Sequence, residues 1–330
     1  MAAKTQSDSG AATAVSSRSP SRVASADPRE VFEQTEYELG DEIGRGGMGL
    51  VYRAVHRKLK RPVAVKLLTD RRIEDAQAVA RFLREMEIVG QLDHPNLVRA
   101  HDAGEIEGVH FLAMELVEGV DLHHLVRAVG RLSVADACEL TRQAAIGLQY
   151  AHQRGLVHQD VKPSNLLLSR EGVVKVADLG LARLDSWRES ADVLNSSDRI
   201  VGTFDFMAPE QAHGSGHVDI AADIYGLGCT LFYLLVGRAP FAHPSHDTPV
   251  KKIMAHVVEP PPAVHELRPD VPLEVSRMIE RALAKKPQDR FAQPAEVGEA
   301  LAPFAAGFDL PRLAQRAIEK LARVSPSTSP

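Results

Sequence analysis

Cysteine is scarce in this sequence. Cys138 and Cys229 are the only two among 330 residues, too few for a disulfide framework and too far apart for a CxxC zinc site. Long apolar runs are also missing. The longest, residues 227–236, contains Gly228 and Thr230 and is shorter than the roughly 20 residues that span a bilayer. The N-terminus lacks a basic segment followed by an apolar one, so no secretory signal is expected. These absences predict a cytoplasmic chain without a transmembrane segment.

A strong charge of one sign is absent as well. The chain has 39 Lys and Arg against 44 Asp and Glu, a formal net charge of −5, and no dense basic stretch, so we expect no nucleic-acid partner. Its fourteen histidines are scattered and form no HExxH motif, which argues against a histidine metal centre. The 44% hydrophobic and 25% charged residues are typical of globular proteins and exclude collagen, a wholly disordered chain and a pure coiled coil.

The pattern along the chain divides it into three parts. Residues 1–36 are rich in Ser and Ala and poor in large apolar side chains, which predicts a disordered tail, with ordered structure beginning near Tyr37. The first third then shows β-rich runs and one helix. After Gly119 the pattern becomes helical, with a Ser133–Asp136 capping box opening a long helix. The sequence therefore predicts an α+β fold.

Two strands near Tyr37 and Val51 flank a glycine cluster, Gly44-Arg45-Gly46-Gly47-Met48-Gly49. Because β-prone residues follow the cluster, the glycines join strand to strand and do not open a helix as in a Rossmann unit. Such a turn lets backbone N–H groups cover the phosphates of a nucleotide. The simpler alternative is a flexible hairpin tip.

Lys66 lies on the next predicted strand, residues 63–68, and the period of two places Ala64 on the same face. A small side chain beside a long cation suits a flat base with its phosphates further along. A lysine at a strand edge is the ordinary alternative. Two further strands are expected near residues 97–101 and 110–114. On the helix before them, Glu85 or Glu87 could reach Lys66.

The most specific constellation is His158-Gln159-Asp160-Val-Lys162-Pro-Ser-Asn165, followed by Asp178-Leu179-Gly180 and Ala208-Pro209-Glu210. With the glycine cluster and Val63-Ala64-Val65-Lys66, this ordered series resembles the signature of eukaryotic-type Ser/Thr protein kinases, most of all their bacterial members. The resemblance covers residues 37–304. It implies a bilobal fold, with a small antiparallel sheet lobe at 37–116, a larger helical lobe at 117–304, and an amphipathic helix and Ser/Pro tail at 305–330.

The resemblance also implies a role for each matching residue, with ATP and Mg²⁺ as substrate and cofactor. Asp160 would accept the substrate proton, Lys162 would neutralise the γ-phosphate, Lys66 oriented by Glu85 would hold the α- and β-phosphates, and Thr203 would support the catalytic loop. Asn165 and Asp178 would hold Mg²⁺, a hard cation that prefers oxygen ligands. Met114 would be the gatekeeper, and the hinge would begin at Glu115. The nucleotide site would comprise Ile43, Gly44, Arg45, Gly46, Gly47, Met48, Gly49, Leu50, Val51, Ala64, Lys66, Met114, Glu115 and Val117.

Two structural pairs follow from the same resemblance. Asp223 would tie the catalytic loop to a buried helix, and Arg290 would pair with Glu210. Two motifs are similar to the forms found in Ser/Thr kinases: Asp160-Val-Lys162-Pro163, and Gly202-Thr203 before Ala-Pro-Glu. This resemblance implies protein substrates.

Gln159 departs from the family pattern, which has arginine there to bind a phosphorylated activation loop. A neutral amide cannot bind phosphate bidentately. We therefore expect only weak dependence on loop phosphorylation, although Ser186, Ser190, Ser196, Ser197 and Thr203 are available. Leu179 replaces the usual phenylalanine and keeps an apolar side chain.

Two questions stay open at this stage. The chain could be an active kinase or a pseudokinase that binds nucleotide as a scaffold, although Lys66, Asp160 and Asp178 are all retained. The helix expected at 310–322 could dock on the large lobe, bind a partner or act as a membrane-proximal spacer. Its basic face would also allow weak adsorption to a surface.

Overall fold

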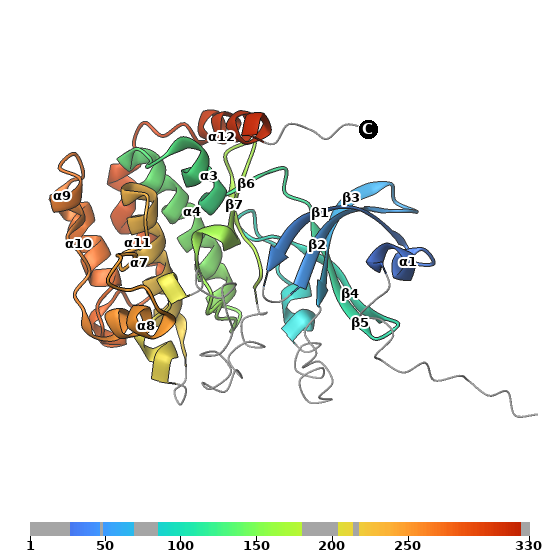
Figure 1. Cartoon of the computed structure of the whole chain (residues 1–330), viewed down its shortest axis with the longest axis horizontal. Coiled ribbons are helices and arrows are strands. Elements are labelled where there is room, and N and C mark those ends of the chain that lie inside the picture. The colour runs from blue at the N-terminus through green and yellow to red at the C-terminus, as the bar shows by residue number, and fades with distance from the viewer. Residues whose placement is uncertain (1–26, 47–48, 69–84, 180–203, 214–217, 325–330) are drawn as a thin grey trace, which may run out of the picture.

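The chain folds into a small lobe built on a sheet and a larger lobe built mainly of helices, which lie side by side in Figure 1. The α+β bilobal fold predicted from the sequence is therefore confirmed. The computed structural model describes residues 27–46, 49–68, 85–179, 204–213 and 218–324.

The small lobe contains a five-stranded antiparallel sheet in the order β1-β2-β3-β5-β4. Its strands are β1 (Tyr37–Gly46), β2 (Gly49–His56), β3 (Arg61–Leu68), β4 (Ala100–Ile106) and β5 (Val109–Glu115). β5 agrees with its prediction, whereas the strand predicted at residues 97–101 begins only at Ala100. Leu97 forms an isolated bridge to Val176 of the large lobe instead, so its apolar side chain is buried outside the sheet.

The two faces of this sheet contribute to different cores, because successive side chains of a strand point to opposite sides. On β3, Val63, Val65 and Leu67 join the outer cluster, whereas Ala64 and Leu68 join the cluster that continues into the large lobe. Lys66 therefore shares its face with Ala64, as the alternation predicts.

Ordered structure begins earlier than the predicted boundary at Tyr37. Helix α1 (Pro28–Phe32) is capped by Asp27, whose carboxylate accepts a hydrogen bond from the Arg29 N–H. Phe32 is 1% exposed, and its ring meets that of Phe111 edge to face, with 5.4 Å between centroids. The average composition of residues 1–36 hid this helix, because one aromatic side chain on the sheet is enough to anchor a single helical turn. The rest of the predicted tail, residues 1–26, lies outside the described residues.

The large lobe is organised around two buried helices, α4 (Val134–His152) and α7 (Ile220–Val236). Ser133 caps α4 by accepting the Asp136 N–H at 3.1 Å, which confirms the predicted capping box. A small sheet lies beside α4 and is made of β6 (Gly119–Asp121), β7 (Leu166–Ser169) and β8 (Val174–Val176).

Shorter elements complete this lobe. The remaining α-helices are α3 (Leu122–Val129), α8 (Pro249–Val258), α9 (Val264–Leu267), α10 (Leu273–Ala282), α11 (Pro294–Leu301) and α12 (Leu310–Val324). The 3₁₀ turns are η3 (Pro163–Asn165), η4 (Phe204–Phe206), η5 (Pro209–His213), η6 (Pro287–Asp289) and η7 (Ala302–Phe304). Within the described residues, none of the helices combines the length and the apolar character needed to span a bilayer.

α7 approaches the loop between α4 and β7 very closely at a glycine. A Cβ added to Gly226 would lie 2.6 Å from the backbone oxygen of Val161, closer than real Cβ contacts allow. Gly226 therefore permits α7 to support the loop that carries Asp160 and Lys162. This contact positions the candidate site on the most buried helix of the molecule.

Candidate active site

Lys66 forms an ion pair that joins the two lobes. Its ammonium group lies 2.8 Å from Asp178 Oδ1, and Lys66 is 4% exposed although it carries a charge. A lysine at that depth needs a charged partner to offset desolvation. The reading of Lys66 as a solvated strand-edge lysine is therefore wrong, and the two residues predicted to hold the phosphates and Mg²⁺ are in contact.

Asp178 adopts an unusual backbone conformation, with φ of 61°, a region that non-glycine residues rarely occupy. Burial raises the pKa of the Asp178 carboxyl, but the cationic Lys66, with His158 and Lys162, lowers it more, so the pKa is below its ordinary value. Asp178 is therefore an anion at neutral pH and able to bind cations. The next residue, Leu179, is 5% exposed, so it fills the apolar site expected for the usual phenylalanine.

Asp160 lies among groups that recognise its carboxylate. The Lys162 ammonium is 2.7 Å from Asp160 Oδ2, and Asn165 Nδ2 donates to the same oxygen at 2.9 Å and to the Asp160 backbone oxygen at 2.8 Å. Asn165 sits on η3, which begins at Pro163. The two donors fix the side chain of Asp160, and among the described residues Oδ1 is left for another proton donor.

Ala177 holds Asp178 beside this loop. The Ala177 N–H donates to Asn165 O at 2.9 Å, and the His158 Nε2 lies 2.8 Å from Ala177 O. Both bonds connect the residue before Asp178 to the segment that contains Asp160. Asp160, Lys162, Asn165 and Asp178 are thus brought together.

Asp223, on α7, fixes the backbone of the catalytic loop through hydrogen bonds. Its carboxylate, at the first turn of α7 and fully buried, accepts the His158 N–H at 2.8 Å and the Gln159 N–H at 2.7 Å, as predicted. Gln159 has φ of 64°, so these bonds hold a strained residue next to Asp160. Sequence analysis missed a third partner, His152, whose Nε2 lies 2.7 Å from Asp223 Oδ2. No local motif indicates this contact, which only the packing of α4 on α7 creates.

Gln159 connects the catalytic loop to the segment after residue 203 without any charge. Its side-chain amide donates to Val218 O at 3.3 Å, and its backbone oxygen accepts from Gln211 Nε2 at 2.7 Å. Gln211 also accepts the Ala208 N–H at 2.8 Å. Two neutral amides therefore span the place where the family pattern has an arginine.

Glu210 and Arg290 form the predicted pair. Two guanidinium nitrogens of Arg290 lie 2.7 and 2.8 Å from the two carboxylate oxygens of Glu210. Arg290 also donates to the backbone oxygens of Ala221 and Ala284. A fully buried arginine is satisfied in this way by a bidentate carboxylate and by carbonyls.

The glycine cluster forms the end of a hairpin between β1 and β2. Gly46 and Gly49 face each other across the strands, which confirms the strand-to-strand connection. Gly49 has φ of 146°, and a Cβ there would lie 1.8 Å from Leu67 O, so no other residue fits without moving β3. Gly44 and Leu50 belong to the same hairpin. Arg45 does not point to a buried site, because it pairs with Glu42 at 2.6 Å on the surface.

The predicted base-binding wall lies on β3 and β5. Ala64 pairs with Met114 across these strands, and both are buried in the cluster against which Val51 also packs. The Glu115 N–H donates to Arg99 O at 2.8 Å, and its carboxylate accepts from Lys175 at 3.1 Å. Val117 is half-buried after the end of β5, whereas Ile43 is exposed.

Some predicted residues cannot be placed. Gly47, Met48 and Thr203 lie outside the described residues. Glu85 begins the helical turn at residues 85–90 and is half-buried, while Glu87 is exposed, and this burial difference favours Glu85. Its pairing with Lys66 stays a prediction.

The side chains of the site provide the oxygen ligands that Mg²⁺ requires. Asp178 and Asn165 offer carboxylate and amide oxygens, the donors that Mg²⁺ prefers, and this ion keeps several waters and needs few protein ligands. Within the described ranges, no three His, Cys, Asp or Glu side chains group as a metal site. The residues present therefore fit Mg²⁺ held with a nucleotide and do not fit a metal enclosed by protein ligands alone.

Comparison with known proteins agrees with this geometry. The family profile described as "Protein kinase domain" matches residues 37–300, four fifths of the chain. The chain belongs to the protein kinase family. The crystal structure of the Mycobacterium tuberculosis PknI kinase domain superimposes with a TM-score of 0.64 at 30% identity, covering 82% of this chain and 97% of that one.

Two similar curated proteins are bacterial kinases. Serine/threonine-protein kinase PknB of Mycolicibacterium smegmatis is 36% identical over 79% of the chain, and PknB of Mycobacterium tuberculosis is 37% identical over 79% of it. In both cases the matched region covers 41% of the relative. The chain thus spans less than half of the length of these relatives.

Proposed function

We propose that this chain is a Ser/Thr protein kinase that transfers the γ-phosphate of ATP to hydroxyl groups of proteins in the presence of Mg²⁺. The observation that carries the proposal is the connected cluster of Lys66–Asp178 and Asp160–Lys162–Asn165. A pseudokinase would be expected to lack at least one of these charged groups. The names of the bacterial relatives support the same activity.

The chemistry assigns one task to each residue. Asp160 takes the proton as the acceptor oxygen forms its bond to the γ-phosphorus and the bond from that phosphorus to the bridging oxygen breaks, leaving ADP. Lys162 offsets charge on the transferred group, and Lys66 holds the other phosphates. Mg²⁺, when bound, supplies positive charge to the phosphate oxygens, with Asp178 and Asn165 as its protein ligands. The glycine hairpin covers the phosphates and excludes water.

Substrate class follows from the catalytic loop and the relatives. We infer a protein substrate with Ser or Thr acceptors. After incubation of the chain with labelled ATP, Mg²⁺ and a general protein acceptor, phosphoamino-acid analysis should show phosphoserine and phosphothreonine. Phosphotyrosine as the main product would overturn the assignment of substrate class. Nucleotide binding without any phosphorylated amino acid would favour the pseudokinase alternative.

Regulation of the site follows from Gln159. Two hydrogen bonds donated by side-chain amides, from Gln159 to Val218 O and from Gln211 to Gln159 O, join the catalytic loop to the following segment. This connection does not require a phosphate. We therefore expect that phosphatase treatment leaves most of the activity of the purified chain intact. The measurement is the initial rate before and after treatment. Loss of activity, with recovery when residues 186–203 are phosphorylated again, would contradict this independence.

The two cysteines and the net charge bear on location and partners. Cys138 and Cys229 are both buried and unpaired, which suits the reducing cytoplasm predicted from the sequence. Nucleic acid is not expected as a partner, because the net charge is −5. Protein substrates are the partners that the proposed reaction requires.

A further inference from the structure

Helix α12 lies beyond the region that the family profile matches, residues 37–300. It packs on α3, β6 and β7. One face of the helix, made of Leu310, Leu313, Ala314 and Ala317, is buried against these elements. The apolar side of α12 is therefore already covered by the large lobe. Of the three roles considered for this helix, the structure shows docking on the large lobe.

The start of α12 is fixed to the lobe. The Asp309 N–H donates to Asp136 Oδ1 at 3.1 Å, which links this end to the first turn of α4. Pro311 packs on Gly172, where an added Cβ would lie 2.7 Å from Pro311 Cδ. The outer face of α12 consequently belongs to a rigid surface of the kinase domain.

That outer face carries four cations in one line. Arg312, Arg316, Lys320 and Arg323, here called the basic stripe, are separated by four, four and three residues, so they share one side of the helix over about 16 Å. All four are exposed. None makes an ion pair with the residues that the structure describes. The acidic neighbour Glu319 is hydrogen-bonded to Gln315 at 3.0 Å.

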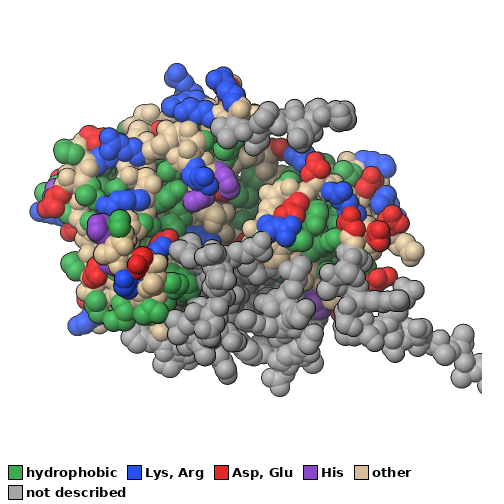
Figure 2. All heavy atoms as spheres, viewed as in Figure 1, with side chains coloured by type: hydrophobic (Ala, Val, Ile, Leu, Met, Phe, Trp, Pro, Cys, Tyr) green, Lys and Arg blue, Asp and Glu red, His purple; other side chains and the backbone are tan. Residues whose placement is uncertain are grey.

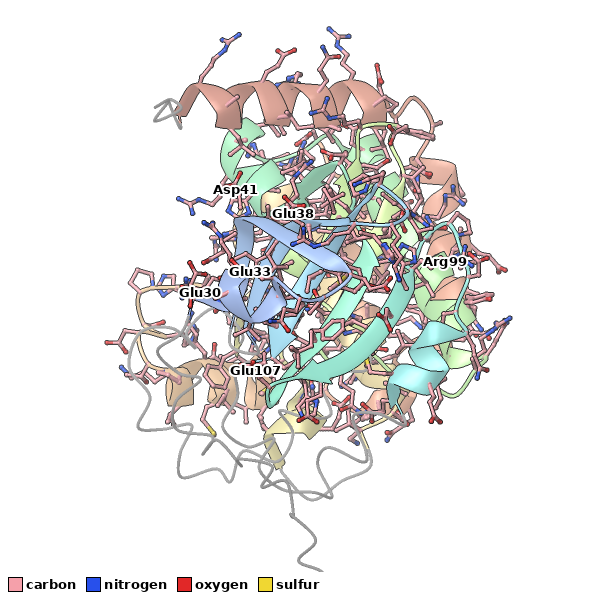
Figure 3. All side chains as sticks on the ribbon, turned by 90° about the vertical axis from the view of Figure 1, so that its right-hand side faces the viewer. Glu30, Glu33, Glu38, Asp41, Arg99 and Glu107 are labelled. Carbon is pink, nitrogen blue, oxygen red and sulfur yellow. The ribbon has the colours of Figure 1, made fainter. Side chains whose placement is uncertain are left out.

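The basic stripe contrasts with the charge of the whole chain. The net charge is −5, and removing the four positive charges of the stripe would give −9. The basic stripe is therefore a local row of positive charge on a chain whose remaining net charge is negative. Figure 2 shows blue side chains gathered over α12 at the upper edge, and Figure 3 shows side chains projecting from this helix away from the body of the protein.

We propose that the basic stripe docks the kinase domain on an anionic phospholipid surface. A straight ridge of cations can contact many headgroups at once, and each Lys or Arg near such a surface adds to binding within a Debye length. Because the apolar face of α12 is buried in the protein, the contact is electrostatic and does not involve insertion into the lipid. The proposal does not depend on the proposed catalytic activity.

The shape of the surface favours lipid over an acidic peptide. The groove beside α12, about 650 Å³, has mixed lining, because Asp309 and Glu319 lie there with Arg170 and Arg312. It therefore offers no continuous basic channel for a peptide. α8, η4 and η5 lie at the opposite edge of the large lobe from α12 in Figure 1. Docking through the stripe would leave that edge exposed to solvent.

The test is sedimentation of the full chain with vesicles of phosphatidylcholine containing about one third phosphatidylglycerol, at about 0.15 M NaCl. The variant Arg312→Gln/Arg316→Gln/Lys320→Gln/Arg323→Gln should bind at least about tenfold more weakly than the wild type. Vesicles of phosphatidylcholine alone should bind neither protein, and about 0.5 M NaCl should release the wild type.

A matched variant separates the stripe from general positive charge. Lys60→Gln/Arg61→Gln/Arg277→Gln/Lys286→Gln removes four exposed cations elsewhere and should bind the anionic vesicles nearly as well as the wild type. Equal binding by the wild type and the stripe variant would overturn the proposal, provided that circular dichroism shows both to be folded. Binding of the wild type to immobilised polyglutamate, with no binding to the anionic vesicles, would also overturn it, in favour of an acidic protein partner.

Discussion

Replacing Asp160 by Asn is expected to lower kcat by about 10²–10⁴-fold, the range that a positioned acid–base group contributes, while the KM for ATP stays close to the wild-type value. An amide can still accept a hydrogen bond from Lys162 or Asn165, so the loop should keep its shape. It cannot take the proton of the acceptor hydroxyl. The loss should therefore fall on the chemical step and not on nucleotide binding.

The measurement is steady-state phosphorylation of a protein acceptor, with ATP varied. Asp41→Asn is the matched control, because Asp41 is an exposed carboxylate on the small lobe, labelled in Figure 3, and makes the same change of charge. That control should retain the wild-type kcat. A kcat for Asp160→Asn within about twofold of the wild type would remove Asp160 from the proposed mechanism.

Positions that depend on local pattern could be predicted from the sequence. Alternation along β3 correctly placed Ala64 and Lys66 on one face, and the capping box at Ser133 correctly began α4. The family resemblance predicted contacts between residues far apart in the sequence. Examples are Asp223 with the catalytic loop and Arg290 with Glu210. In each case the residue type already restricts its partner, because a buried charge requires a complementary group.

Contacts that arise only from packing were not predictable. His152 reaches Asp223 because α4 crosses α7, and nothing in the sequence near His152 indicates it. Phe32 lies in a segment whose average composition suggests disorder, yet the outer face of the sheet buries it. The close approach of Gly226 to Val161 likewise exists only once α7 is in place. These features depend on surfaces supplied by distant parts of the chain.

Replacing Asp178 by Asn is the second change with a large expected effect, because it removes the only carboxylate assigned to Mg²⁺. The carboxylate, whose pKa is lowered, is ionised at neutral pH, whereas an amide carries no charge. The phosphate-transfer rate should fall by at least about 10²-fold, the cost of losing a group that stabilises charge in the transition state. The concentration of Mg²⁺ that gives half of the maximal rate should rise.

The account depends most directly on whether this cluster transfers phosphate with the help of a divalent cation. The decisive measurement is the transfer of labelled γ-phosphate from ATP to a protein acceptor as Mg²⁺ is titrated, for the wild type, Asp178→Asn and the Asp41→Asn control. We predict Mg²⁺-dependent transfer by the wild type and the control, abolished by EDTA, and little transfer by Asp178→Asn. Equal rates and equal Mg²⁺ requirements for the wild type and Asp178→Asn would contradict the account.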